Sequence, residues 1–375
     1  MGPGFYLHVP FCARKCPYCD FYSLETRRSS ATHTEFLDAL GVELKLLPDT
    51  FRPVTLFMGG GTPTELSEPD LQRMLDLLTA HLDLRDLREW TCEANPGTCT
   101  PAKADLLRAA GVNRISMGAQ SFNPVHLAFL GRIHDPADSV ASYHLLRKAG
   151  FTNINLDLMY GLPGSDIAQT QFDIHEVVRL APEHASCYGL IFEPGTPLMA
   201  RKQRGEVQSI DEELEREQYE IIRTTLIEAG YEQYEISNFA RPGHACTHNL
   251  LYWGGGEYIG CGPSAHSHWN GQRYANVRGL QPYCQALQKG ESPVTFAERL
   301  EGPEKARETL IMWLRRLDGV PRDAFREATG YDYHHLCGPA IEHLCAIGVL
   351  TEENECLRLT EEGVYISDSV FAELV

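Results

Sequence analysis

The chain has 375 residues, enough for two or three domains with a buried core. Its 43% hydrophobic and 22% charged content is that of a folded globular protein, and 33 basic against 51 acidic residues give a net charge of −18. This acidic excess disfavours binding to nucleic acid or to anionic membrane surfaces. No apolar run is long enough to predict a transmembrane helix and no signal peptide is evident, so we expect a cytoplasmic protein.

Strand-like and helix-like segments alternate through the first 230 residues. Helical spacing predicts a helix over 32–47, and capping residues predict later helix starts at Ser67, Thr100 and Ser209, the last helix running to Gly230. Six apolar runs ending in Gly, Pro or polar residues predict strands at 5–10, 54–63, 89–97, 113–122, 153–164 and 185–195.

This alternation predicts an α/β fold with a parallel sheet and helices outside it. Polar or glycine-rich residues follow nearly every predicted strand, as they do at the mouth of a barrel. A doubly wound sheet would concentrate them at one switch point. Six units are too few to close an eight-stranded barrel, so we expect a partial (β/α)6 barrel.

Three regions are expected from the change in pattern along the chain. Residues 1–235 form the barrel, and residues 236–295 form a connecting region that is rich in Gly, His and aromatic residues. Residues 296–375 are mainly helical and contain a hairpin-like element, which predicts a small winged-helix-like domain.

Three cysteines, Cys12, Cys16 and Cys19, crowd the loop after the first predicted strand. Three thiolates at Cys-x3-Cys-x2-Cys spacing can bind three corners of an iron–sulfur cube and leave one iron open. A zinc site would want a fourth ligand, usually from a second pair, and the chain has no second Cys-x2-Cys. A redox pair of Cys16 and Cys19 would leave Cys12 unexplained.

The cysteine spacing followed by "GGGTP" after the second strand resembles the radical S-adenosylmethionine (SAM) superfamily. In that superfamily the open iron of a [4Fe–4S] cluster binds the amino and carboxylate groups of SAM. The further motifs resemble the coproporphyrinogen oxidase-like branch, and within it the heme chaperones; they are "YLHVPFCARKCPYCDF", "EANPG", "NRISMGAQSFN", "LGRIH", "NLDLMYGLPG" and "HNLLYW". The resemblance covers nearly the whole chain and implies a radical SAM barrel.

The resemblance also implies roles for individual residues. Positions matching those around the first SAM are Tyr6, Gly60, Gly61, Thr62 and Glu93. Tyr18 is a further expected cofactor-binding residue. Positions matching the contacts of a second SAM in the oxidases are Gln120, Arg132 and Asp157. Carboxylates at strand ends suit ribose hydroxyls and an arginine suits a carboxylate, although each side chain could equally form an ordinary ion pair or cap a strand.

Phe21 occupies the position where the oxidases have a further cysteine, which favours the chaperones. The segment "HNLLYW" resembles their heme-binding motif, with His248 as the expected heme ligand. From the residues alone, a structural cluster of His and aromatic side chains is the alternative. Nearby side chains that could also bind iron are His244, Cys246, His266 and His268.

The resemblance implies a protein that binds a [4Fe–4S] cluster, SAM and heme and delivers heme to an acceptor protein. The alternative is an enzyme, an oxygen-independent coproporphyrinogen III oxidase that decarboxylates propionate side chains. An electron donor would be a further partner if SAM is cleaved.

Overall fold

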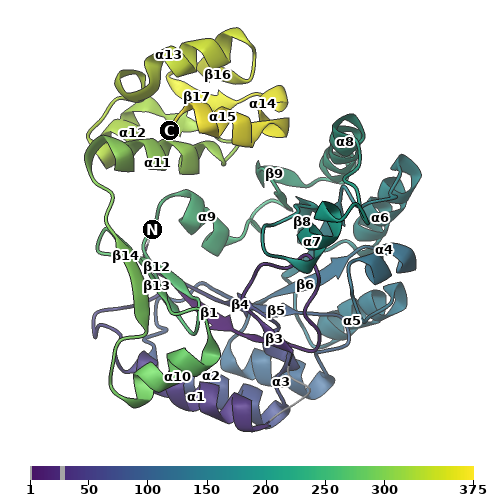
Figure 1. The fold of residues 1–375 in the computed structure, drawn as a ribbon, viewed down its shortest axis with the longest axis vertical. Helices are drawn as coiled ribbons and strands as arrows, with labels where there is room; N and C mark the ends of the chain where they lie inside the picture. Colours follow the sequence, from purple (N-terminus) through teal and green to yellow (C-terminus); the bar gives the residue numbers. More distant parts are fainter. Residues whose placement is uncertain (1, 26–29) are drawn as a thin grey trace.

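The computed structural model describes residues 2–25 and 30–375, which form a large and a small part (Figure 1). The large part contains six parallel strands that pair with one another in chain order, as the predicted partial barrel requires. These strands are β1 (Gly4–Val9), β4 (Thr55–Gly60), β5 (Glu89–Ala94), β6 (Arg114–Gln120), β7 (Ile154–Tyr160) and β8 (His184–Gly189).

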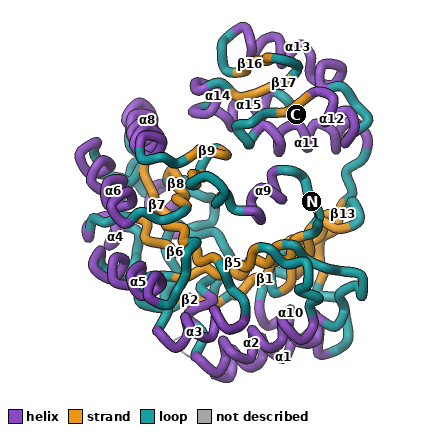
Figure 2. The backbone as a smooth tube through the Cα atoms, turned by 180° about the vertical axis from the view of Figure 1, so that it is seen from behind, coloured by secondary structure: helices purple, strands orange, loops and turns teal. Residues whose placement is uncertain are grey.

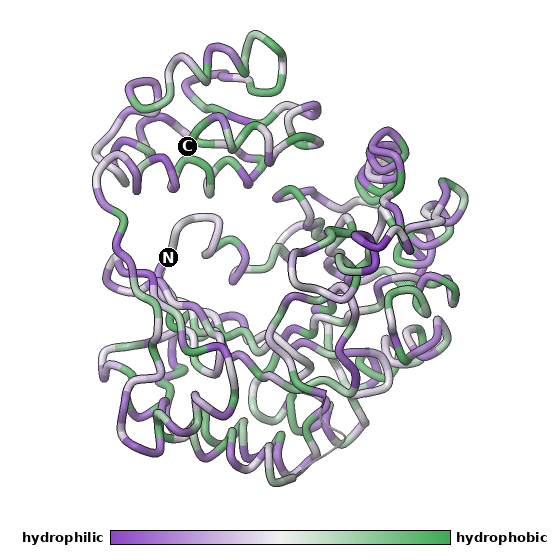
Figure 3. The backbone as a smooth tube through the Cα atoms, in the orientation of Figure 1, coloured by the Kyte–Doolittle hydropathy of each residue, from purple (hydrophilic) through white to green (hydrophobic). Residues whose placement is uncertain are grey.

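Helices follow these strands along the chain and cover the outer face of the sheet (Figure 2). They are α1 (Ser30–Leu44), α2 (Glu68–His81), α3 (Pro101–Ala110), α5 (Pro136–Lys148), α6 (Ile167–Leu180) and α8 (Glu212–Glu228). In Figure 3 hydrophobic and hydrophilic stretches alternate along them, as expected for helices with one buried face. Shorter elements in the connections are β2 (Phe11–Cys12), β3 (Leu24–Glu25), a 3₁₀ turn (Pro63–Glu65), α4 (Pro124–Phe129) and α7 (Pro197–Gln203).

The predicted helix starts are mostly confirmed. The hydroxyls of Ser67 and Thr100 accept hydrogen bonds from backbone amides in the first turns of α2 and α3. The prediction for Ser209 is wrong, because Asp211 caps α8 through the Glu213 amide. The first helix also ends at Leu44, earlier than predicted.

The predicted connecting region 236–295, together with a few residues on either side of it (232–298 in all), extends the sheet to twelve strands. Strand β11 pairs in parallel with β1, the next three strands add to it antiparallel, and β9 and β10 lie beside β8. The bounds are β9 (Glu232–Glu235), β10 (Asn238–Ala240), α9 (Thr247–Trp253), β11 (Tyr258–Cys261), β12 (His266–Trp269), β13 (Gln272–Asn276), α10 (Leu280–Gln288) and β14 (Val294–Glu298). These strands have three to five residues, too few to give a recognisable period.

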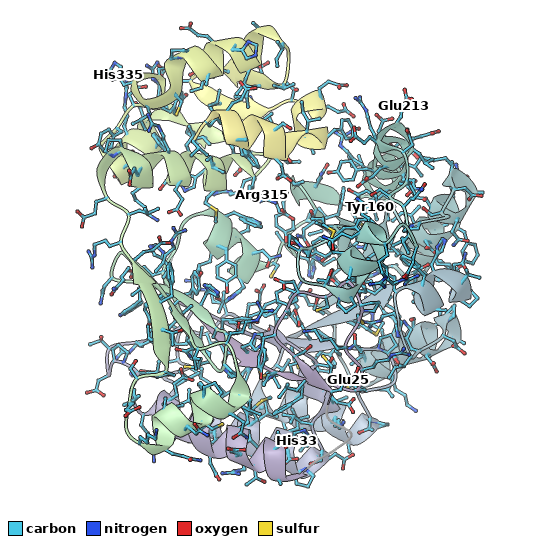
Figure 4. The ribbon with its side chains drawn as sticks, viewed as in Figure 1. Glu25, His33, Tyr160, Glu213, Arg315 and His335 are labelled. Carbon is cyan, nitrogen blue, oxygen red and sulfur yellow. The ribbon has the colours of Figure 1, made fainter. Side chains whose placement is uncertain are left out.

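The small part has its own apolar core and a three-stranded sheet that includes the expected hairpin. It comprises α11 (Gly302–Leu314), β15 (Val320–Pro321), α12 (Arg322–Thr329), α13 (Tyr333–Ala346), β16 (Leu350–Glu353), β17 (Cys356–Leu359), α14 (Glu361–Tyr365) and α15 (Ser367–Glu373). Arg315, labelled in Figure 4, lies on the side that faces α9, with its guanidinium 4.5 Å from the centre of the Trp253 ring. Within residues 2–25 and 30–375, no helix is both long and apolar enough to cross a bilayer.

Candidate functional site

The three clustered cysteines lie on a loop between two very short strands. Strand β2 ends at Cys12 and pairs in parallel with β3, which closes the loop at its base. The Cys19 amide donates to the Cys16 carbonyl at 3.2 Å, so the last two cysteines share a turn. All three side chains are partly exposed, whereas seven of the other nine cysteines are buried. The loop therefore presents its thiols to a cavity rather than to the core.

The loop at the end of β4, residues 60–62, is hydrogen-bonded to the segment that leads into the cysteine loop. The amides of Gly61 and Thr62 donate to the carbonyls of Val9 and Phe11 at 2.8 and 2.7 Å. A Cβ atom on Gly61 would lie 2.5 Å from the Phe11 oxygen, and Gly60 has a positive φ of 94°. Close backbone packing therefore explains both glycines, independently of any ligand.

The cysteines open into a cavity of about 640 Å³, which we call the cluster cavity. Its lining includes most of the predicted cofactor-binding residues: Cys12, Cys16, Tyr18, Cys19, Gly60, Gly61, Thr62, Glu93, Gln120, Arg132 and Asp157. The fold thus brings together side chains from five predicted strand ends, as the barrel interpretation expects.

Arg132 connects the cysteine loop to the strands. Its guanidinium donates to the Cys16 sulfur at 3.7 Å, to the Gly118 carbonyl at 2.8 Å and to the Asn95 side chain. Asn95 in turn donates to the Thr62 hydroxyl at 2.7 Å, and this hydroxyl lies 3.8 Å from the Cys12 sulfur. Positive charge and hydrogen-bond donors beside the sulfurs stabilise thiolates, the form that binds iron.

Two half-buried carboxyl groups, Glu93 and Asp157, line the same cavity. The Gly60 backbone amide donates to Glu93 at 3.2 Å, and the Asn155 side chain donates through Nδ2 to Asp157 at 2.6 Å. Burial, with a smaller effect of Asp157, raises the pKa of Glu93 to about 8, and burial also raises the pKa of Asp157. A carboxyl group that holds a proton can donate as well as accept a hydrogen bond, so both groups are suited to polar groups of a ligand.

Tyr6 and His248, also predicted to bind cofactors, lie in an adjoining cavity of about 480 Å³. We call it the aromatic cavity, after its lining by Tyr6, Phe21, Tyr22, Phe57, Tyr252 and Tyr258. Phe21, Phe57, Gly60, Glu93 and Asn249 line both cavities, so the two cavities share a wall. Tyr6 donates to Nδ1 of His8 at 3.1 Å, and Nε2 of His8 bonds to the Tyr22 carbonyl at 2.7 Å.

His248 is one of the two buried side chains of α9, with Leu251. Its ring stacks on Phe57 with centroids 5.3 Å apart and meets the Tyr252 ring edge-on at 4.6 Å. Nδ1 lies 2.8 Å from the Thr55 hydroxyl, and the buried Nε2 has no hydrogen-bond partner. Burial, reinforced by the charge of Arg114, lowers the pKa of His248 to about 3, so the imidazole is neutral at physiological pH.

Of the other side chains considered as iron ligands, His266 lines the aromatic cavity. Cys246 is buried and lies 3.4 Å from a Glu89 oxygen, and Nδ1 of His268 bonds to the Gly256 carbonyl. Neither of these two, nor His244, lines either cavity.

Glu89, which no sequence pattern singles out, anchors α9. Its carboxylate accepts hydrogen bonds from the amides of Thr247 at 2.8 Å and His248 at 3.0 Å. Cys246, at the N-cap, provides no side-chain cap, so Glu89 caps the helix from a neighbouring strand. Glu89 lies 157 positions before Cys246, and no local capping pattern could reveal this contact.

The cysteine loop fits an iron–sulfur cluster better than a single metal ion. Among the described residues, no three His, Cys, Asp or Glu side chains are grouped to hold one metal ion. An iron–sulfur cube does not need such a grouping, since each thiolate binds a different iron.

Comparison with known proteins places the chain in a family. Residues 6–177 match the radical SAM superfamily model, and residues 300–366 match the model of the HemN C-terminal domain. A protein named heme chaperone HemW from Bacillus subtilis is 35% identical, over 98% of this chain and 97% of its own. The chain belongs to the HemW family of radical SAM proteins. Another member, from Escherichia coli, is 36% identical over 97% of this chain and 96% of its own.

The fold agrees with this HemW assignment. The solved structure of Escherichia coli HemN, a coproporphyrinogen III oxidase, covers the whole chain with a TM-score of 0.86 and 22% identity, over 90% of its own length. This similarity extends through the C-terminal part and confirms the expected fold class. Membership of the radical SAM superfamily implies a [4Fe–4S] cluster and SAM as cofactors.

Proposed function

We propose that this protein is a heme chaperone that holds a [4Fe–4S] cluster through Cys12, Cys16 and Cys19 and binds SAM beside it. Heme occupies the aromatic cavity and is passed from there to an acceptor protein. The cluster and SAM, when bound, supply the redox chemistry of the superfamily. The residues of this chain hold the cluster, orient SAM through Arg132 and the carboxyl groups of Glu93 and Asp157, and keep both next to the heme.

The observation that supports heme most strongly is His248. Its imidazole is neutral, and with Nδ1–H donating to the Thr55 hydroxyl the partnerless Nε2 has a free lone pair for iron. The cavity beside it has aromatic walls, which suit the flat face of a porphyrin. Because Nε2 is shielded from solvent, iron ligation requires a neighbouring ring, that of Phe57 or Tyr252, to move aside.

Phe21 favours the chaperone over an oxidase. It stands where the oxidases have a further cysteine, and its ring, 65% exposed, borders both cavities. An exposed aromatic ring at this position can stack on a bound tetrapyrrole. It provides no thiol for chemistry at the cluster.

The test is anaerobic reconstitution of the cluster followed by heme titration of the wild type and of His248→Ala. We expect the substitution to shift the Soret band and lower heme retention while the iron and sulfide of the cluster stay unchanged. His244→Ala is the matched control, since His244 lines neither cavity, and it should bind heme like the wild type. Unchanged heme binding in His248→Ala would assign the iron to another side chain, with His266 next.

A further inference from the structure

Arg114 is a buried cation that the sequence analysis did not single out. It is the first residue of β6, has 2% of its surface exposed and lines the cluster cavity. Its Nε has no hydrogen-bond partner, and its guanidinium forms no ion pair or hydrogen bond with any described residue. A guanidinium has five N–H donors and stays charged at every accessible pH. Leaving such a group buried and unpaired is costly.

Arg132, in the same cavity, has hydrogen-bond acceptors for its guanidinium. Its donors reach a sulfur, a backbone carbonyl and the Asn95 side chain. No comparable acceptor is placed for Arg114. This contrast indicates that the acceptor for Arg114 comes from a ligand.

The carboxyl groups around Arg114 already accept hydrogen bonds from other donors. Glu89 accepts from the first amides of α9, Asp157 from Asn155, and Glu93 from Gly60. Burial raises the pKa of Glu93 to about 8, so Glu93 provides little negative charge at neutral pH. The positive charge of Arg114 is therefore only partly balanced by the protein.

Arg114 lies at the amino end of β6, away from the cysteine loop. The strand extends from Arg114 to Gln120, a rise of roughly 20 Å at about 3.3 Å per residue, and the cysteine loop lies beyond the carboxyl ends of the strands. A carboxylate bound at the cluster is thus at the opposite end of the cavity. Asn249 of α9, next to His248, lines both cavities, so the aromatic cavity and the cluster cavity meet near the helix that holds His248.

We propose that Arg114 binds a propionate carboxylate of the tetrapyrrole whose ring occupies the aromatic cavity. This inference rests on the proposed function and adds the group by which the protein recognises its ligand. The macrocycle contacts the aromatic walls and His248. One propionate passes beside Asn249 into the end of the cluster cavity that Arg114 lines. A contact between the guanidinium cation and a propionate carboxylate favours a tetrapyrrole with free carboxylates over an esterified one.

The experiment compares heme with heme dimethyl ester, which lacks both carboxylates. Anaerobically reconstituted wild type should bind heme about ten- to a hundredfold more tightly than the ester, the effect of one charge-assisted hydrogen bond. Arg114→Gln should remove most of this preference by weakening heme and leaving the ester unchanged, while Arg114→Lys should keep part of it. Equal wild-type affinity for heme and ester would overturn the proposal without any variant.

Two further comparisons separate the proposal from its alternatives. Arg278→Gln is the matched variant, since Arg278 borders the aromatic cavity but already bonds to Asp20. Loss of the heme preference in Arg278→Gln, with Arg114→Gln unaffected, would overturn the assignment. A fall in SAM affinity in Arg114→Gln, with unchanged heme affinity, would assign the carboxylate to SAM and overturn it too. If the wild type binds neither porphyrin, the proposed function itself fails.

Discussion

Removing the Glu89 carboxylate is predicted to loosen the helix that holds His248. Glu89 accepts two amide hydrogen bonds at the start of α9 and balances part of the charge of Arg114. A hydrogen bond to a charged group is worth about 1.5–3 kcal/mol, and Glu89→Ala removes two of them. We therefore expect Glu89→Ala to destabilise α9 by about 3–5 kcal/mol. Glu89→Gln keeps one acceptor oxygen but loses the charge, and should cost about 1–2 kcal/mol.

Hydrogen exchange resolves this effect at the helix itself. In Glu89→Gln the amides of residues 247–254 should exchange about five- to thirtyfold faster, as expected for a loss of about 1–2 kcal/mol in local stability. Heme affinity should fall with it, and the cluster should stay intact because Glu89 does not line the cluster cavity. Glu217→Ala, at an exposed position on α8, is the control. Unchanged exchange at 247–254 in both Glu89 variants would refute the anchoring role.

Three further predictions concern the cluster cavity. Alanine at any one of the three clustered cysteines should abolish a stable four-iron cluster, measured as iron, sulfide and visible absorption, whereas Cys345→Ala on α13 should keep it. Arg132→Gln or Asp157→Asn should weaken SAM binding about ten- to a hundredfold in equilibrium dialysis with the cluster retained; unchanged affinity would make both residues structural. Because the pKa of Glu93 is raised from 4.5 to about 8, the folded protein holds a proton that the unfolded chain loses, and Glu93 lowers stability as pH rises from 4.5 to 8. Glu93→Gln should gain stability relative to the iron-free wild type across this range in urea unfolding, and a pH-independent difference would contradict the shift.

The sequence was informative where local patterns determine structure. The period of the strands, the caps at Ser67 and Thr100 and the spacing of the cysteines are all short-range features, and the structure confirms the first two. The partial barrel followed from the alternation of strands and helices alone. The predicted helix start at Ser209 was wrong because Asp211, two residues later, is an equally good N-cap and lies directly before the first turn of α8.

Features that depend on long-range contacts could not be predicted from sequence patterns. Glu89 and Arg114 are the first residues of their strands, a position where a charged side chain is usually predicted to be exposed to solvent. Their burial depends on α9 returning to the barrel interior more than a hundred residues later. The same path of the chain places His248 in a cavity next to the cysteine loop. Motifs in the sequence could not predict that these two segments lie close together.

The most direct test of the central claim offers the reconstituted protein heme and coproporphyrinogen III together, with SAM and a reductant, under anaerobic conditions. Chromatography of the tetrapyrroles after separation from free ligand measures both outcomes at once. The account predicts that heme stays with the protein and that coproporphyrinogen III is recovered unchanged. Conversion of coproporphyrinogen III to protoporphyrinogen with no heme retained would contradict it.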